Sequence, residues 1–247
     1  MSTQVDGPVL FIADLHLCAA EVATTRAFEA FLAGPARQAR TLYILGDLFE
    51  YWAGDDDLAA PYHRHIAKHL TDLTITGTPV VFLAGNRDFL IGAEFCAATG
   101  ITLAIEPVTI SLGGRDAVLL HGDILCTDDH AYQAFRQQVR NPVWQAAFLA
   151  RPLDERRAII EGVRAHSEAG KQQKAANIMD VNEAAVISAF QAARCDLMIH
   201  GHTHRPATHI HHADGRPCER WVLSDWHGTA PYLAWSDGTL TRKELLV

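Results

Sequence analysis

Five short apolar runs, each ending at a polar residue and four of them beside glycine, constrain the fold of this 247-residue chain most strongly. Apolar runs without polar interruption suit strands that are covered on both faces of a sheet. Helix-forming stretches lie between the early runs, at about 24–39, 61–73 and 91–98. This alternation predicts an α/β layered core. The runs are 9–13 before Asp14, 42–45 before Asp47, 80–83 before Asn86, 118–120 before His121, and 197–199 before His200.

The polar residues at these strand ends are expected to meet, because ligands in α/β sheets gather at the carboxyl ends of strands. Asp14 and His16 are two positions apart, so both side chains point to one side of a strand end. Neighbouring glycines permit the tight turns that aim such side chains inward. The five motifs are Asp14-Leu15-His16, Gly46-Asp47, Gly85-Asn86-Arg87-Asp88, His121-Gly122-Asp123 and His200-Gly201-His202-Thr203-His204.

These motifs together offer carboxylates, imidazoles and one amide oxygen. Nitrogen and oxygen donors in this mixture suit Mn, Fe, Zn or similar metals rather than a cysteine-based structural zinc site. Each motif alone is typical of an ordinary turn, so the prediction of a metal centre depends on their joint occurrence. Asp88 and Asp123 are either residues that orient ligands or plain turn residues, and we favour the orienting role for Asp123.

Other histidines receive a simpler interpretation. His63, His65 and His69 lie at helical spacing and are expected on a solvated helix face. His209, His211 and His212 follow a strand-like run, and no role is assigned to them.

The second half of the chain changes character. Residues 127–193 are mostly helix formers interrupted by Pro142 and Pro152, which predicts a helical insertion between two core strands. Segments 207–212, 219–224, 231–236 and 239–246 are short and together rich in Trp, Val and Leu, with Asp-Gly turn signals at 214–215 and 237–238. We expect hairpins that finish a second sheet. The prediction is one domain over 1–247, a sandwich with helices outside.

Charge and cysteine content exclude several function classes. Lys plus Arg is 21 and Asp plus Glu is 29, a net charge of −8, which disfavours a general nucleic-acid binder. Between 131 and 174, however, there are eight basic and four acidic residues, so the insertion is locally basic. The five cysteines form no CxxC pair, which favours a reducing cytoplasm. We expect neither a signal peptide nor a membrane span.

The order of the five motifs resembles the calcineurin-like metallophosphoesterase superfamily. The resemblance implies a four-layer αββα sandwich with two divalent metals that clamp a phosphate and activate a water. One metal is expected to bind Asp14, His16 and His204. The other is expected to bind Asn86, His121 and His202, with Asp47 bridging both.

Longer signatures resemble one family of that superfamily, the UDP-2,3-diacylglucosamine pyrophosphatases of lipid A biosynthesis. They are FIADLHLC, LYILGDLFEYW, GNRDFLIG, HGDILCTDDHAYQAFR, IMDVN and IHGHTHRPA, from Phe11 to about Trp226. The resemblance implies manganese and attack of water on the α-phosphorus, giving UMP and 2,3-diacylglucosamine 1-phosphate. The implied catalytic residues are Asp47, Asn86, Arg87, His121 and His202. The implied substrate contacts are Asn86, Arg87, Asp129, Ser167, Lys171, Lys174 and His202; at Lys171 the family often has Asn.

A diacylated diphosphate substrate needs apolar and basic surfaces. The basic insertion and Arg87 are expected to meet the diphosphate, and Tyr132, Phe135, Trp144 and Phe148 either form an apolar trough or pack helix on helix. We expect a monomer, peripheral on the cytoplasmic face of the bacterial inner membrane, without nucleic-acid partners. One alternative is another dinuclear-metal phosphodiesterase or nucleotide pyrophosphatase. The other is a non-catalytic scaffold, and the presence of a metal-binding residue at all seven ligand positions argues against it.

Overall fold

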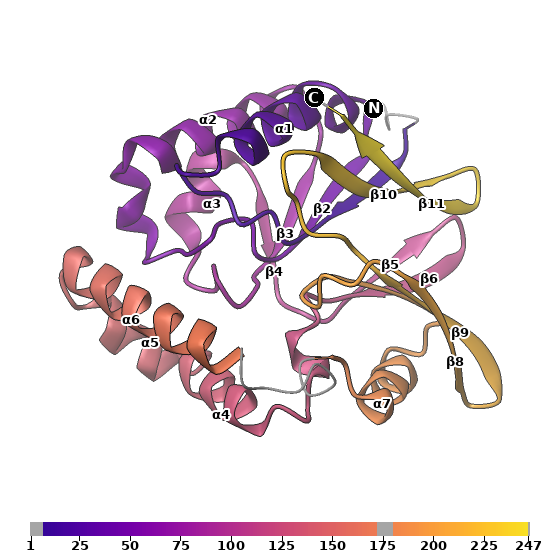
Figure 1. Ribbon diagram of the computed structural model, residues 1–247. Helices are drawn as coiled ribbons and strands as arrows, with labels where there is room; N and C mark the ends of the chain where they lie inside the picture. Colours follow the sequence, from indigo (N-terminus) through magenta and orange to yellow (C-terminus); the bar gives the residue numbers. More distant parts are fainter. Residues whose placement is uncertain (1–6, 172–179, 247) are drawn as a thin grey trace.

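Two β-sheets face each other in the middle of the molecule (Figure 1). The computed structural model describes residues 7–171 and 180–246. The first sheet has the strand order β11-β10-β1-β2-β3-β4, and the second has β5-β6-β7-β9-β8. The strands are β1 Val9–Ile12, β2 Thr41–Leu45, β3 Val80–Leu83, β4 Thr102–Ala104, β5 Val108–Leu112, β6 Arg115–Leu119, β7 Leu197–His200, β8 Thr208–Ala213, β9 Arg216–Val222, β10 Ala230–Ser236 and β11 Thr239–Leu245.

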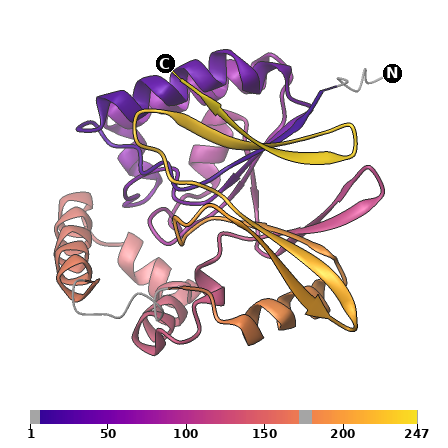
Figure 2. The same cartoon turned by 45° about the vertical axis from the view of Figure 1, so that its right-hand side comes forward.

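Helices cover the outer faces of both sheets (Figures 1 and 2). Helices α1 (Val22–Ala33), α2 (Pro61–Ile75) and α3 (Ala93–Thr99) lie on the first sheet, and α7 (Glu183–Ala193) lies on the second. In β1, Leu10 and Ile12 pack under the helices, while Val9 and Phe11 pack between the sheets. This burial on both faces explains the uninterrupted apolar run. The predicted αββα sandwich of two mixed sheets is confirmed.

The last two strands correct the sequence prediction. The β8–β9 hairpin completes the second sheet as expected, but β10 and β11 join the first sheet, where β10 pairs antiparallel with β1. The turn signal at Asp237 and Gly238 fixes the hairpin, with both residues at positive φ, but it carries no information about which sheet the hairpin joins. Strands β4 and β5 were not predicted.

The helical insertion between β6 and β7 is confirmed in outline. It contains α4 (His130–Val139), α5 (Pro142–Leu149) and α6 (Leu153–Lys171), which lie beside the two sheets (Figure 1). Pro142 stands in the first turn of α5, where its missing N–H costs nothing, and Asn141 caps that helix. The last helix of the predicted insertion, α7, packs instead on the second sheet through Val186 and Phe190.

Smaller elements follow from local chemistry. The helix predicted over 24–39 ends at Ala33, because Gly34 and Pro35 lead into a separate 3₁₀ helix, Pro35–Gln38. Two further 3₁₀ helices are Asp55–Ala59 and Asp123–Leu125. Within the described part of the chain, no helix is both long enough and apolar enough to cross a bilayer.

Candidate metal centre

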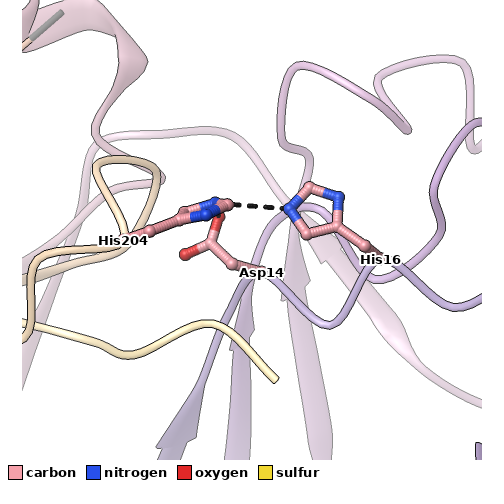
Figure 3. Close-up of side chains that lie close together, drawn as sticks. All are labelled: Asp14, His16 and His204. Carbon is pink, nitrogen blue, oxygen red and sulfur yellow. Dashed lines mark hydrogen bonds and ion pairs between the residues drawn. The ribbon is translucent and has the colours of Figure 1, made fainter. Parts of the chain in front are cut away.

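Seven predicted ligands converge where β1, β2, β3, β6 and β7 end. The first group is Asp14, His16 and His204 (Figure 3). The Nε2 atoms of His16 and His204 lie 3.3 Å apart, and His204 Nε2 lies 3.5 Å from Asp14 Oδ1. These donor atoms all lie within 4.8 Å of one another, which is the spacing of groups that can share one cation. His16 and His204 keep 21% and 35% of their side-chain surface exposed, so a ligand can reach this group.

The second group is Asn86, His121 and His202. Asn86 Oδ1 lies 3.0 Å from His121 Nε2 and 2.8 Å from His202 Nδ1. An amide oxygen that faces two imidazole nitrogens can share a metal ion with them.

Asp47 lies between the two groups. Its Oδ2 is 3.9 Å from His16 Nε2, and its Oδ1 is 3.8 Å from His121 Nε2. One carboxylate therefore directs one oxygen to each group, which is the arrangement required of a bridging ligand.

The backbone at the strand ends is bent to present these side chains. Asp14, His16, Asp47, His202 and His204 all have positive φ, between 50° and 70°. This left-handed conformation costs a residue other than glycine roughly 1 kcal/mol or more. It persists here because strands on either side fix the chain, as in the bond from Asp14 N to Gly46 O, 3.1 Å.

Two glycines allow the motifs to approach one another. A Cβ atom on Gly85 would lie 2.2 Å from Asp47 Oδ1, and one on Gly201 would lie 2.2 Å from Asp14 Oδ2. Neither position has room for a side chain, which accounts for glycine beside Asn86 and His202.

Three ligand histidines are oriented through the ring nitrogen that faces away from the centre. His121 Nδ1 lies 2.8 Å from Leu45 O, so this nitrogen donates and leaves Nε2 as the lone-pair donor. His16 Nδ1 lies 3.0 Å from Glu50 Oε2, and His204 Nδ1 lies 3.1 Å from Asp225 Oδ2. Such outer partners fix the ring and raise its basicity as a metal ligand.

Glu50 and Asp225 were missed by the sequence analysis. Glu50 stands three positions after Asp47, inside a motif that had already been singled out. Asp225 follows the buried run that ends at Val222 and Leu223, so it repeats the pattern of an apolar strand ending in a polar residue. This repeated pattern is the sequence signal that could have identified Asp225.

Electrostatics in the centre favour bound cations. Burial lowers the pKa of His121, but the carboxylates of Asp47 and Asp14 outweigh burial and raise it to about 9. Burial, together with the nearby His121, lowers the pKa of His202 to about 4. The carboxylates of the centre therefore favour a positive charge beside them. Bound divalent ions can supply that charge, and the imidazoles then stay neutral and able to coordinate.

Asp88 and Asp123 support the centre through the backbone and the insertion. Asp88 is buried and accepts hydrogen bonds from the N–H groups of Leu48 and Gly85, at 2.7 and 2.8 Å. It therefore ties together the loops that carry Asp47 and Asn86. Asp123 accepts from Tyr132 Oη at 2.6 Å and from Arg136 Nε at 2.8 Å, which fastens α4 beside the metal loops.

The predicted substrate contacts are placed in part. The Arg87 backbone N donates to Asp47 Oδ1 at 2.8 Å, and its guanidinium lies 3.9 Å from Glu50. Asp129 caps α4, accepting from Tyr132 N at 3.1 Å. The backbone of α6 includes Ser167 and Lys171, but their side chains, and Lys174 entirely, lie outside the described residues.

Most arginine side chains of the insertion form ion pairs or hydrogen bonds with residues outside it. Five arginines tie α4 and α6 to loops and 3₁₀ helices next to the sheets instead of standing free for a diphosphate. Arg136 pairs with Glu106 and Asp123, Arg140 with the carbonyls of Ala84 and Gly85, Arg156 with Asp56 and Ala53 O, Arg157 with Asp57, and Arg164 with Glu50.

Two further sequence interpretations change. Trp144 and Phe148 stack at 4.9 Å and pack against the main core, so they are packing residues, while Phe135 stays exposed. His63 is buried, with Nδ1 3.0 Å from Asp57 O, so it does not share the solvated face of His65. The helix turns it inward, because it stands two positions before His65, on the other side of α2.

The donor set fits divalent metals. Asp14 Oδ1 is buried without a hydrogen-bond partner, although it faces the centre. Such an atom is costly unless a cation satisfies it. Carboxylate, amide and imidazole donors in two groups joined by one carboxylate therefore form a candidate dinuclear metal centre.

Comparison with known proteins agrees with this geometry. The model of the calcineurin-like phosphoesterase family matches residues 7–206. The chain belongs to the calcineurin-like phosphoesterase family. This phosphoesterase is similar to the UDP-2,3-diacylglucosamine hydrolase of Aromatoleum aromaticum, 55% identical over 92% of each chain. It is also similar to the Escherichia coli protein of that name, 50% identical over 88% of this chain and 90% of that one.

Among solved structures, a novel archaeal phosphodiesterase covers 97% of this chain and 99% of its own, with 10% identity and a TM-score of 0.47. The expectation of a metal-dependent hydrolase is confirmed by the family and by the curated relatives.

Proposed function

We propose that this phosphoesterase hydrolyses the diphosphate bond of UDP-2,3-diacylglucosamine, giving UMP and 2,3-diacylglucosamine 1-phosphate in lipid A biosynthesis. The observation that carries the proposal is the similarity, across about nine tenths of the chain, to proteins named for hydrolysis of this substrate. The complete donor set of the centre supports catalysis rather than a scaffold role.

The centre is proposed to hold two divalent ions, with manganese as the native metal. Asp14, His16 and His204 would hold one ion and Asn86, His121 and His202 the other, with Asp47 shared. Such ions supply a water of lowered pKa and neutralise charge on the phosphate.

The residues around the centre orient this chemistry. The Leu45 carbonyl holds the ring of His121, and Glu50 and Asp225 hold those of His16 and His204. Arg87 directly follows Asn86, so its guanidinium is proposed to donate hydrogen bonds to a phosphate oxygen. A donor fixed before the reaction stabilises the charge that develops on the transferring phosphoryl group.

The insertion is proposed to receive the rest of the substrate. Phe135, Val143, Leu149 and Val163 are exposed apolar residues on α4, α5 and α6, with exposures from 39% to 79%. They supply apolar surface for acyl chains, and Asp129, Ser167, Lys171 and Lys174 are proposed polar contacts. We propose that the same surface also attaches the protein peripherally to the cytoplasmic face of the inner membrane.

One assay separates this proposal from a phosphodiesterase of another specificity. The purified protein is given Mn²⁺ with UDP-2,3-diacylglucosamine in detergent, and separately with bis-p-nitrophenyl phosphate and cyclic nucleotides. We expect the diacylated substrate to be cleaved with by far the highest kcat/KM. Cleavage of the water-soluble diesters alone would contradict the proposal, and no cleavage of any compound would favour the scaffold.

A further inference from the structure

A second cluster of metal-binding side chains lies on the outer helices. His65 and His69 stand on α2, and Glu29 faces them from α1. Glu29 Oε1 lies 2.5 Å from His65 Nε2 and 3.7 Å from His69 Nε2. The donor atoms of all three residues lie within 4.8 Å of one another.

The spacing of these donors is close to that of a bound metal. Zinc bound tetrahedrally at about 2.0–2.1 Å sets neighbouring ligand atoms about 3.3 Å apart. The contact between Glu29 and His65 must open by about 0.8 Å to reach that value, and the contact between Glu29 and His69 must close by about 0.4 Å. Rotamer adjustments are enough, because the side chains of His65 and His69 are 48% and 32% exposed.

The geometry of α2 and its packing beside α1 bring the three side chains together. Residues four apart on a helix lie one above the other, so His65 and His69 present both rings to the same point. The two rings lie 4.8 Å apart at 76°. Helices α1 and α2 lie side by side on the first sheet, which brings Glu29 to that point (Figure 1).

The negative charge of Glu29 is available to a metal cation. Among the described residues, the ion-pair partners of Glu29 are His65 and His69, with no lysine or arginine. Lys68, on the same helix, pairs with Asp72 at 2.5 Å instead. Glu29 therefore offers a carboxylate, beside two imidazoles, to a metal ion.

We propose that Glu29, His65 and His69 bind one Zn²⁺ ion, with a fourth position open to water. Zinc is favoured over manganese at two imidazoles and one carboxylate, since imidazole nitrogen suits zinc, whereas manganese prefers carboxylate, carbonyl and water oxygens. The ion would join α1 to α2 on the outer, helix-covered face of the first sheet. The proposal does not depend on the substrate of that centre.

Metal stoichiometry tests the proposal. Manganese-loaded wild-type protein and the His69→Ala variant are dialysed to equilibrium against buffer with Zn²⁺ and Mn²⁺, and total metal per chain is measured by mass spectrometry. We expect one more ion per chain in the wild type than in His69→Ala. Because zinc and manganese are summed, exchange at the catalytic centre does not alter the difference. His212→Ala removes an exposed histidine elsewhere and should match the wild type.

Thermal unfolding gives an independent measurement. Zinc at about 100 times its dissociation constant should raise the Tm of the wild type by roughly 5 °C more than that of His69→Ala. Glu29→Gln should lose most of this difference, because the carboxylate supplies the negative charge. Equal metal content and equal Tm shifts in wild type and His69→Ala would overturn the proposal. Circular dichroism checks that both variants are folded.

Discussion

Adding a single methyl group at Gly85 should lower catalysis sharply by displacing Asp47. The new Cβ would lie 2.2 Å from Asp47 Oδ1 and 2.4 Å from Asp47 N. Ordinary contact begins at 3.4 Å, so the Asp47 carboxylate must withdraw by about 1.2 Å. A misplacement of about 1 Å can cost about 100-fold in rate. We therefore expect Gly85→Ala to lose at least about 100-fold in kcat/KM, which is about 2.7 kcal/mol of transition-state stabilisation.

The assay measures kcat/KM, metal content and Tm on the same preparations. Gly162→Ala is the matched control, because a Cβ atom there meets nothing within 4 Å. It should keep wild-type activity, as an alanine in a helix is tolerated. A Gly85→Ala variant that binds its full metal and retains activity within about 3-fold would refute the close approach of Gly85 to Asp47 as the reason for glycine at this position.

Three further predictions concern single side chains. Asp47→Ala should lower kcat by roughly 10³-fold or more and reduce bound metal while the protein stays folded by circular dichroism; surviving activity would contradict the bridging role. Asp225→Asn should weaken metal binding roughly 10–100-fold in a chelator competition. His227→Ala is the comparison variant and should weaken metal binding less than Asp225→Asn: His227 lies 2.8 Å from Asp225 Oδ2, the oxygen that also faces His204, but it is 82% exposed and leaves the carboxylate in place. Burial raises the pKa of Asp57, but hydrogen bonds with His63 and Arg157 outweigh it and hold the pKa below its usual value. Its stabilisation is therefore present above pH about 4 and lost as the pH falls further. The difference in free energy of unfolding between wild type and Asp57→Asn, measured in urea, should shrink at low pH, and a constant difference would contradict this.

The part of the fold that the sequence predicted is the part fixed by local periodicity. Strands β1, β2, β3, β6 and β7 are short apolar runs buried on both faces, and α1 to α3 lie between the early ones. The sheet joined by β10 and β11 was assigned wrongly, because pairing with β1 connects residues more than 200 positions apart and leaves no local pattern. β4 is an edge strand of three residues, too short to show periodicity.

In the candidate site, too, the sequence predicted the residues that belong to local motifs and missed those that depend on distant contacts. Its seven proposed ligands follow strand ends by two to four residues, so their motifs could be identified from the sequence, and the structure brings them together. Glu50 and Asp225 act behind the ligands, where the side-chain direction decides their role. The partners of the insertion's arginines, such as Asp57 for Arg157 and Glu50 for Arg164, are about a hundred residues away in sequence, so its basic charge was interpreted as free.

The central claim is that this phosphoesterase directs water to the α-phosphorus of UDP-2,3-diacylglucosamine. Hydrolysis in ¹⁸O-labelled water, with manganese and detergent, tests it most directly. Mass spectrometry of both products should find one labelled oxygen in UMP and none in 2,3-diacylglucosamine 1-phosphate. Label in the lipid phosphate, or no cleavage by protein that still hydrolyses soluble diesters, would contradict the account.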